Sequence, residues 1–540
     1  MYACPNCGGE LKFDIESQKL KCSYCQTLVD PYSFQDVRGA KERSSGDGSL
    51  MDDEFEVTQF VCPQCGASMI SQDNTAAAFC SFCGASTVLK SRVSREKKPD
   101  AIIPFKKTKK DCMDSFQNLM RHSLFAPKEL RDPSCVDSFR GIYMPYWVYD
   151  VKYRGDFTVH GIQTTRDGNY DVTSHYNLTG KIDADYQGIT HDASKNFSDD
   201  ISESIAPYNV REMKVFNASF LSGFYADTAD VQPKVYEQDV EELTNTICNQ
   251  AFLDVPQFKS YSLKTELNEK STPFRGGTPE SHYSLFPVWF MSYRKNDRVG
   301  YVTVNGQTGK AAADIPIDFT KYTLGSLLLA VPLFFILNFF LSITAKSALI
   351  LSALFALLTL IISFVEYGKI KGHEAGLHDR GLHNDTSDNG RKNVFVDRLP
   401  RIKSSKNRGK HFSGKSFLYV LYFFLLIASS GGGLIALMTL AGVILLGAGI
   451  CKLIDFDFDF SPKPKFPTRS YGFAGSLIAL ITALAILIRN PVSDYFYYIG
   501  AMVSAAAIFI TMIEIIKNYN LLSTRELPQF HRRGGDDRAK

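Results

Sequence analysis

The chain has 540 residues, a formal net charge of +3 and 45% hydrophobic residues. This length allows about two to four folded units of ~100–200 residues each, and so small a net charge does not by itself indicate a nucleic-acid binder. The hydrophobic residues are unevenly distributed, because residues 1–318 are polar and mixed whereas residues 322–516 hold long apolar runs. The first residues, MYACPNCGGELKFD, contain no apolar core segment, so we expect no secretory signal peptide.

Two segments near the start repeat one cysteine pattern. CPNCGGELKFDIESQKLKCSYC and CPQCGASMISQDNTAAAFCSFC each carry two C-x-x-C pairs with fourteen residues between them, and the second copy is offset by 58 positions. A Zn²⁺ ion takes four thiolates in a tetrahedron, and four protein ligands leave no position for water or substrate. We therefore predict two structural zinc ions, with redox dithiols as the alternative. The predicted ligands are Cys4, Cys7, Cys22, Cys25, Cys62, Cys65, Cys80 and Cys83.

These repeats predict two small β-type zinc ribbons, at residues 1–32 and 58–92, joined by a flexible linker at residues 33–57. Tyr24 and Phe82 occupy the same place in the two last cysteine turns, where each could contact a partner or fill a small core. Gln26 replaces the glycine that follows the other turns, which we expect to loosen that turn. The charges of the first ribbon nearly balance and the acidic segment DDEFE precedes the second, so we favour protein contact over nucleic acid.

Residues 101–318 have the composition of an α+β domain. Two segments, KKDCMDSFQNLMRHSL and VYEQDVEELTNTICNQAF, show helical spacing, and Asp167-Gly168 within an alternating segment predicts a hairpin. The two tryptophans lie in similar segments, PYWVYD and FPVWF. Either the domain is internally duplicated, with Trp147 and Trp289 in equivalent strands, or these are two unrelated core tryptophans. The apolar face predicted for the second helix consists of Val240, Leu243, Ile247 and Ala251.

The apolar runs of the second half predict about six membrane-spanning helices, because each is long enough to cross a ~30 Å hydrocarbon layer. The predicted spans are residues 322–343, 347–365, 416–432, 434–452, 471–488 and 496–516. The loop 367–415 and the tail 517–540 carry most of the nearby Lys and Arg, so both should be cytoplasmic, together with both termini. The spans have no ionisable residue near mid-depth, which argues against an ion-coupled carrier.

One segment matches the phosphate-loop pattern G-x-x-x-x-G-K-[ST]: GKHFSGKS, at residues 409–416. A working phosphate loop needs a buried strand before it and a soluble helix after it. Here RIKSSKNR precedes the match and an apolar run typical of a membrane span follows it. We therefore interpret the match as coincidental, and its lysines as charges on the inner side of a membrane.

The paired CPxCG…CxxC ribbons, the PYWVYD and FPVWF strands, the segment VNGQTGK and the C-terminal spans together resemble a bacterial protein family. These are TFIIB-type zinc-ribbon membrane proteins, often mislabelled as primosomal or helicase-like. They are encoded in membrane-stress operons beside a PspA-like coat protein and an SPFH-domain scaffold. The resemblance covers residues 1–318, and it implies an adaptor that recruits cytoplasmic partners, PspA-like or SPFH-domain proteins among them, to the membrane.

The sequence thus predicts a multi-domain, multi-pass protein of the cell membrane that is not an enzyme. It has two Cys4 zinc ribbons, an α+β cytoplasmic domain and an all-α bundle of transmembrane helices. The expected function is that of an adaptor which docks cytoplasmic proteins at the bilayer, and the basic residues from Arg391 to Lys415 could attract anionic lipids. Two alternatives stay open: a channel, carrier or lipid-handling protein regulated by the ribbons, and a membrane-tethered nucleic-acid binder.

Overall fold

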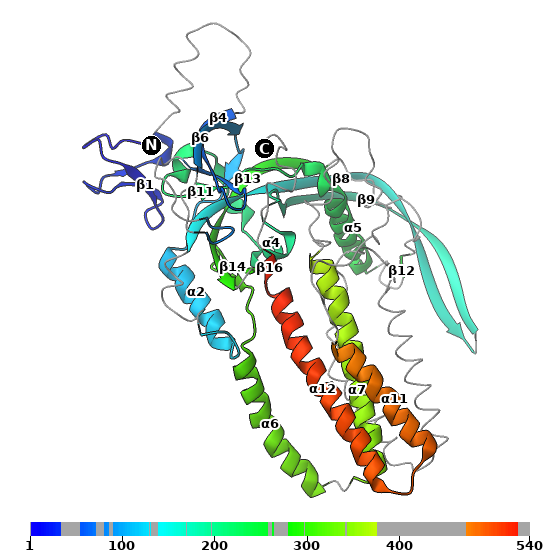
Figure 1. Ribbon diagram of the computed structural model, residues 1–540. Coiled ribbons are helices and arrows are strands. Elements are labelled where there is room, and N and C mark those ends of the chain that lie inside the picture. Colours follow the sequence, from blue (N-terminus) through cyan, green and yellow to red (C-terminus); the bar gives the residue numbers. More distant parts are fainter. Residues whose placement is uncertain are drawn as a thin grey trace, which may run out of the picture.

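Figure 1 shows a computed structural model in which a broad sheet domain lies at one end of several long helices. The structure describes residues 2–33, 54–71, 80–85, 90–128, 130, 139–168, 170–195, 197–256, 262–263, 279–295, 298–340, 343–374 and 471–526. The predicted spans at 416–432 and 434–452, the phosphate-loop match, most of the basic loop and residues 527–540 lie outside these ranges. So do residues 34–53 of the predicted linker.

The first Cys4 cluster, residues 2–33, is a three-stranded sheet. Its strands are β1 (Leu11–Asp14), β2 (Lys19–Cys22) and β3 (Leu28–Val29), and the short helix η1 (Pro31–Ser33) follows them. The cluster is packed against the sheet domain through Phe13, whose ring lies 5.2 Å from that of Phe220 and whose backbone N–H donates to the carbonyl of Ser222. The Gln18 amide donates to the carbonyl of Phe105 at 2.7 Å. The first cluster is therefore fixed to the domain, although the sequence predicts a separate module on a tether.

A single 13-stranded sheet forms the core of the domain, with the order β10-β7-β13-β8-β11-β5-β4-β6 along its main path. The strands of this path are β4 (Glu54–Val61), β5 (Ser68–Ser71), β6 (Lys90–Lys97), β7 (Ala101–Ile102), β8 (Arg140–Asp167), β10 (Lys214–Val215), β11 (Tyr225–Ala226) and β13 (Glu280–Lys295). The remaining strands are β9 (Tyr170–Asp192), β12 (Ser262–Leu263), β14 (Arg298–Asn305), β15 (Ala311–Ala313) and β16 (Arg525–Glu526).

The central pair β8 and β13 is buried on both faces. Alternate side chains of β8 belong to two different cores, since Tyr143 and Trp147 join one and Met144 and Tyr146 join the other. The run GIYMPYWVY is apolar without alternation because neither face of a central strand meets water. The cysteines Cys4 and Cys22 of the first cluster lie in the first of these cores, whereas all four cysteines of the second cluster lie in the other.

The two central strands are related by an approximate twofold arrangement. They are antiparallel, and Met144 faces Phe286 close to the centre of their register. The short strand β11 pairs in parallel with β8 at Ile142 and Tyr143, while β7 pairs in parallel with β13 at Ser284 and Leu285. Ile142 and Ser284 are 142 residues apart in the sequence, and so are Tyr143 and Leu285. Met144 and Phe286 have the same separation.

The two tryptophans occupy equivalent positions in this twofold arrangement. The Trp147 indole N–H donates to the carbonyl of Val231, five residues after β11 ends, at 2.8 Å. The Trp289 indole N–H donates to the carbonyl of Lys107, five residues after β7 ends, also at 2.8 Å. Equivalent strands, parallel partners and indole bonds favour the internal duplication over two unrelated core tryptophans.

The second Cys4 cluster, residues 54–71 with 80–85, is part of this sheet and not a free module. Its strand β5 pairs with β11, and β4 lies between β5 and β6. Strand β4 begins at Glu54, inside the range that the sequence assigns to the linker, and Val57 is buried in the core. The last three residues of the acidic segment DDEFE begin this strand, where Glu54 and Glu56 lie opposite Lys97 and Arg95 of β6 in the register.

Two helices of the domain were predicted from their spacing. Helix α2 (Lys109–His122) buries Phe116 and Met120 as expected. Helix α5 (Glu237–Asp254) buries Val240, Thr244 and Cys248, whereas Leu243 and Ile247 are exposed. The predicted face of α5 is therefore wrong beyond Val240. Thr244 and Cys248 face the sheet because their side chains bond to the hydroxyls of Tyr153 and Tyr186, at 2.6 and 3.1 Å. A third, short helix is α4 (Asp199–Ile205).

The predicted hairpin is present and long. Strands β8 and β9 pair from Tyr146–Asp192 to Asp167–Tyr170, and Gly168 makes the turn with a φ of +59°. The hairpin leaves the sheet and bends toward the end of the molecule that holds the long apolar helices (Figure 1).

Four apolar helices follow the domain in the described part of the chain. They are α6 (Phe319–Phe340), α7 (Ala345–Glu374), α11 (Tyr471–Arg489) and α12 (Asp494–Leu522). Among the described residues three helices are long and apolar enough to cross a membrane, within α6, α7 and α12, and α11 holds a shorter apolar stretch, Gly475–Arg489. Helix α7 continues to Glu374, beyond the predicted end at residue 365 and into the predicted basic loop.

Helices α7, α11 and α12 pack together through small residues. Ala356, Ala479 and Ala507 form one contact layer, and Ser476 and Thr511 join their hydroxyls at 3.2 Å beside it. Small side chains allow apolar helices to approach closely, which is how such helices associate in lipid. Helix α6 differs, because none of its apolar stretch Phe319–Leu337 is buried by the described part of the chain.

The helices are clamped to the sheet domain where α6 begins and α12 ends. The Asn520 side chain accepts a hydrogen bond from the backbone N–H of Ile317 at 2.6 Å and donates to its carbonyl at 3.0 Å. After α12 the chain forms β16, which pairs with β14. Arg298 of β14 donates to the Thr524 hydroxyl and to the carbonyl of Leu521, at 2.8 and 2.9 Å.

Candidate metal centres

Each of the four C-x-x-C turns has the same backbone geometry. The N–H four residues after the first cysteine donates to the carbonyl of that cysteine, over 2.9 to 3.1 Å. The donor residue has a positive φ in every case: +72° at Gly8, +61° at Gln26, +80° at Gly66 and +67° at Gly84. Three glycines adopt this conformation without a Cβ penalty. The turn at Gln26 is formed as well, so the loosening that the sequence suggested is not seen.

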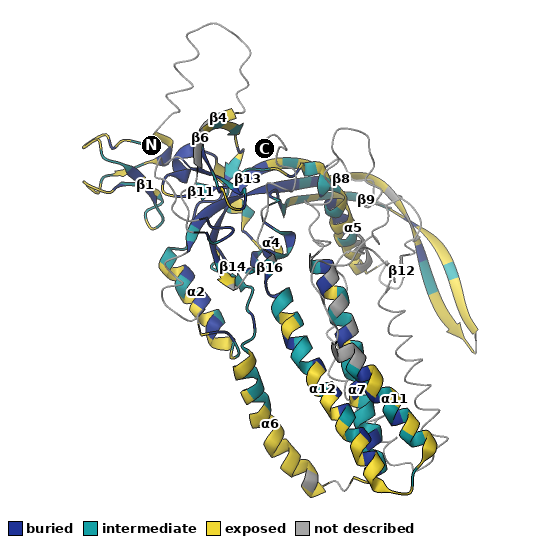
Figure 2. Ribbon diagram, viewed as in Figure 1, coloured by how far each residue is buried: buried dark blue, intermediate teal, exposed yellow. Residues whose placement is uncertain are grey.

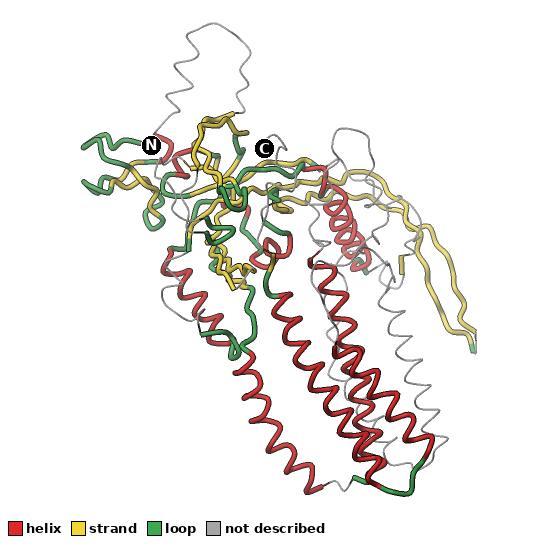
Figure 3. The backbone as a smooth tube through the Cα atoms, in the orientation of Figure 1, coloured by secondary structure: helices red, strands yellow, loops and turns green. Residues whose placement is uncertain are grey.

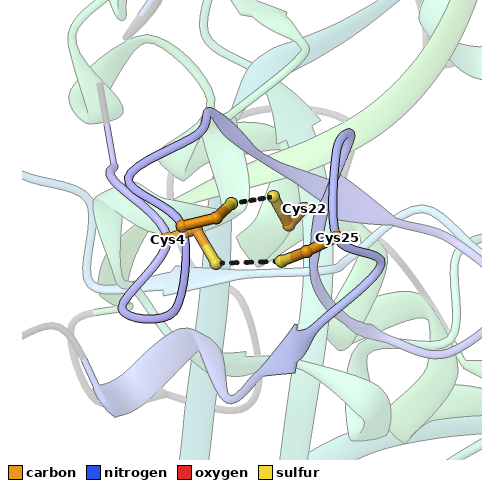
Figure 4. A group of neighbouring side chains, drawn as sticks. Cys4, Cys22 and Cys25 are labelled. Carbon is orange, nitrogen blue, oxygen red and sulfur yellow. Dashed lines mark hydrogen bonds between the residues drawn. The ribbon is translucent and has the colours of Figure 1, made fainter.

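The turns bring the eight predicted ligands together as two groups of four. In each group the sulfurs all lie within 4.8 Å of one another, so each group could hold one metal ion. The closest Sγ pairs are Cys4–Cys25 at 3.5 Å and Cys7–Cys22 at 3.4 Å in the first cluster, where Figure 4 shows the labelled sulfurs pointing toward one another.

The second cluster has the wider sulfur spacing. Its closest Sγ pairs are Cys62–Cys83 at 3.8 Å and Cys65–Cys80 at 3.7 Å. Four sulfurs at ~2.3 Å from one zinc ion lie about 3.8 Å apart, so this arrangement matches a tetrahedral zinc site. A disulfide needs a sulfur separation of about 2.05 Å, which none of these pairs approaches.

The charges of the sulfurs also favour a cation. Hydrogen bonding from the Thr27 side chain lowers the pKa of Cys25 to about 6, so this thiol ionises at neutral pH. In the second cluster hydrogen bonding with Cys80, together with burial, raises the pKa of Cys65 far above its ordinary value. Four neighbouring thiolates repel one another, and a divalent metal supplies the positive charge that allows all four to ionise.

The two clusters differ in their surroundings. All four cysteines of the second cluster are buried, and Phe82, between its last two ligands, is fully buried against Phe290 with their rings 5.6 Å apart. Arg294 of β13 donates to the carbonyl of Cys83 at 2.5 Å and to the Gln64 side chain at 3.2 Å. The second cluster is thus enclosed by the central strands.

The first cluster exposes half of its ligands. Cys4 and Cys22 are buried toward the sheet domain, while Cys7 and Cys25 face solvent. Tyr24, at the position equivalent to Phe82, is 79% exposed. The sequence left two roles open for these aromatic residues, filling a core or contacting a partner. Phe82 fills a core, whereas Tyr24 lies on the surface. Figure 2 shows the contrast between the exposed first cluster and the buried strands beside it.

Gln26→Gly is expected to stabilise the first cluster by about 1 kcal/mol, because glycine adopts a positive φ without steric cost. The measurement is zinc competition with a chromophoric chelator, in which the first site should retain zinc about fivefold more strongly. Gln18→Gly is the matched control, because Gln18 also has a positive φ but its side chain bonds to Ile15 and Phe105. That variant should show no gain, and an equal gain in both variants would contradict the assignment of the cost to Gln26.

Sequence reasoning did not find the partners that enclose the second cluster, such as Arg294 and Phe290. They lie more than 200 positions from the cysteines, and only the sheet brings them near. Cys112 and Cys248 are buried in the domain core and belong to neither cluster. Asn305 and Gln307 of VNGQTGK have a structural role, because they bond to the backbone of Ile205 and Asn209.

The fold and the two centres define a class of protein: two N-terminal Cys4 β clusters, a large mixed-sheet domain with helices, and C-terminal apolar helices. Figure 3 traces these parts along one chain. The chain is similar to the uncharacterized protein YdjG of Bacillus subtilis strain 168, with 29% identity over 328 residues, which is 59% of this chain and 91% of YdjG. No family model and no solved structure matches the chain.

Proposed function

We propose that this chain is a membrane-anchored adaptor. In it the first cluster, with zinc bound by Cys4, Cys7, Cys22 and Cys25, offers a recognition surface to a cytoplasmic protein, and the second cluster, with its own zinc ion, braces the sheet domain. The observation that carries the proposal is the contrast between Tyr24 and Phe82. Two equivalent positions of one repeat have opposite environments, which favours different tasks for the two clusters.

The first cluster has the chemistry of a protein-contact surface. Leu28 and Tyr32 are exposed in addition to Tyr24, and the Tyr32 hydroxyl bonds to the carbonyl of the exposed residue Val215. Exposed aromatic side chains held on a rigid base are typical anchors of protein interfaces. Both lysine and acidic residues lie nearby, with Lys12 paired to Glu10 at 3.5 Å, so no strong positive field favours nucleic acid.

The apolar helices support membrane anchoring. Three helices of the described chain are long and apolar enough to cross a bilayer, and the basic loops predict that the clusters and both termini are cytoplasmic. No catalysis is proposed, because four protein ligands close each metal site. A PspA-like coat protein or an SPFH-domain scaffold is the class of partner that the sequence resemblance implies.

The test compares Tyr24→Ala with Tyr170→Ala in pull-downs of the detergent-solubilised full chain from its own cytoplasm. Tyr170, on the hairpin, is also 79% exposed, so the two variants remove the same surface area at different sites. We expect Tyr24→Ala to lose most of the specific partner while retaining two zinc ions per chain, and Tyr170→Ala to retain both. If Tyr24→Ala and a Cys7→Ser/Cys25→Ser variant capture the same proteins as the wild type, the adaptor proposal fails.

A reconstituted chain gives a second test. An adaptor should produce no ion or lipid flux in sealed vesicles, whereas flux that depends on the chain would favour the channel, carrier or lipid-handling alternative.

A further inference from the structure

The outer part of the β8–β9 hairpin, residues 159–178, is called the distal hairpin here. Its strands pair without interruption from Val159–Leu178 to Asp167–Tyr170. Within the described chain the only added strand is β12, which pairs with two of its residues, Ile162 and Gly161. A two-stranded ribbon is marginally stable in water on its own, so a long projecting ribbon calls for a surface that supports it.

The distal hairpin has two different faces, because directly opposed residues of an antiparallel pair lie on the same side. One face, the aromatic face, carries Tyr170, Val172 and Tyr176, which are 79%, 45% and 41% exposed. They are two or four residues apart on β9, so they point to the same side.

The other face is polar and is held together by its own side chains. Arg166 lies opposite Asp171 and His160 lies opposite Asn177. The His160 and His175 rings are stacked, with their Nε2 and Nδ1 atoms 3.0 Å apart. The ribbon therefore has one hydrogen-bonded polar face and one face on which exposed tyrosines lie beside polar partners, with Tyr170 opposite Asp167 and Val172 opposite Thr165.

The position of the distal hairpin indicates what covers the aromatic face. The hairpin bends away from the sheet toward the end of the molecule that holds the apolar helices, and its tip reaches about the level at which α6 begins (Figure 1). Most of its outer part is exposed (Figure 2). Helix α6 exposes apolar side chains along its length, Leu328 and Phe334 among them. A bilayer that receives α6 meets the distal hairpin as well.

We infer that the aromatic face of the distal hairpin lies in the headgroup layer of the bilayer that the apolar helices cross. Tyrosine is enriched at membrane–water interfaces because its ring is apolar and its hydroxyl stays hydrated. The hairpin then forms a second contact between the sheet domain and the lipid surface, beside the helices. This inference rests on the membrane location in the proposed function and adds a lipid-binding surface to it.

The test places a tryptophan on the aromatic face and measures its contact with lipid. The full-length Tyr170→Trp chain is assembled into nanodiscs of brominated phosphatidylcholine, since bromine atoms quench indole emission at short range. The native Trp147 and Trp289 are buried in the sheet domain and give a constant background. Tyr24→Trp is the matched control, because Tyr24 has the same 79% exposure on the first cluster.

We expect the added tryptophan at position 170 to lose about half of its emission in brominated lipid, because the interface is where such rings reside. Tyr176→Trp, farther from the tip, should lose less, and Tyr24→Trp should lose almost none. If the chain enters the nanodiscs and Tyr170→Trp is quenched no more than Tyr24→Trp, the hairpin inference is overturned while membrane anchoring stands. If the chain does not enter the nanodiscs at all, the membrane location and the proposed function fail together with it.

Discussion

Replacing Cys65 and Cys80 together by serine is expected to unfold the sheet domain, whereas Cys7→Ser/Cys25→Ser should leave it folded. Binding of a structural zinc ion is worth about 10–16 kcal/mol, as much as or more than the total stability of ~5–15 kcal/mol of a typical domain. The sulfurs of the second cluster lie in one core with Phe290 of β13 and Tyr301 of β14. Losing a metal there would open a core that all four ligands share, whereas two ligands of the first cluster, Cys7 and Cys25, are exposed.

The measurement combines thermal unfolding with metal analysis. Trp147 and Trp289 lie in the two central strands, so their emission follows the unfolding of the sheet. The first-cluster variant should bind one zinc ion per chain and keep a cooperative transition, and the second-cluster variant should lose the transition. Cys112→Ser is the control, because Cys112 is a buried thiol outside both clusters. A cooperative transition at the wild-type temperature in Cys65→Ser/Cys80→Ser would show that the second cluster does not brace the domain.

Phe82→Ala is expected to destabilise the sheet domain by about 3–5 kcal/mol, because it leaves a cavity in a closely packed core. The equivalent change Tyr24→Ala should alter stability by about 0.5 kcal/mol or less, since it removes an exposed side chain. Both values can be obtained from guanidinium unfolding of the solubilised chain, followed by tryptophan emission. The comparison uses two positions of one sequence repeat, so the local turn is the same and only the surroundings differ.

Phe82→Leu provides a further check, because leucine fills much of the cavity and should recover a large part of the lost stability. Equal losses for Phe82→Ala and Tyr24→Ala would mean that the surroundings of the two clusters do not set their stability. A second-cluster variant that unfolds would lose its partners whatever their binding site. Partner capture is therefore best tested with variants of the first cluster.

Several features were predictable because short-range rules decide them. The spacing of the cysteines and the glycines after them determine the turns, so both groups of four sulfurs form as predicted. The pair Asp167-Gly168 has the positive-φ residue that a tight hairpin turn needs. The similar segments around Trp147 and Trp289 reflect the same strand pairing and the same indole bond.

Other features depend on contacts between distant segments, which periodicity does not reveal. The second cluster looks like an independent module in the sequence, but β5 pairs with β11 more than 150 positions away. The face of α5 was predicted from its apolar residues, whereas Thr244 faces the core because the Tyr153 hydroxyl is there to pair with it. The difference between Tyr24 and Phe82 arises only because the central strands cover one cluster and leave the other outside.

The double hydrogen bond between Ile317 and Asn520 has a consequence for how the domain is held. Among the described residues, the segment that leads into α6 meets the end of α12 at this point, and β16 then pairs the segment after α12 with β14. A domain joined to the helices by one flexible connection could rotate relative to them. Two neighbouring connections fix the orientation of the sheet domain relative to the helices. In the proposed adaptor, a partner that binds at Tyr24 would then meet the first cluster at a set angle and height above the lipid.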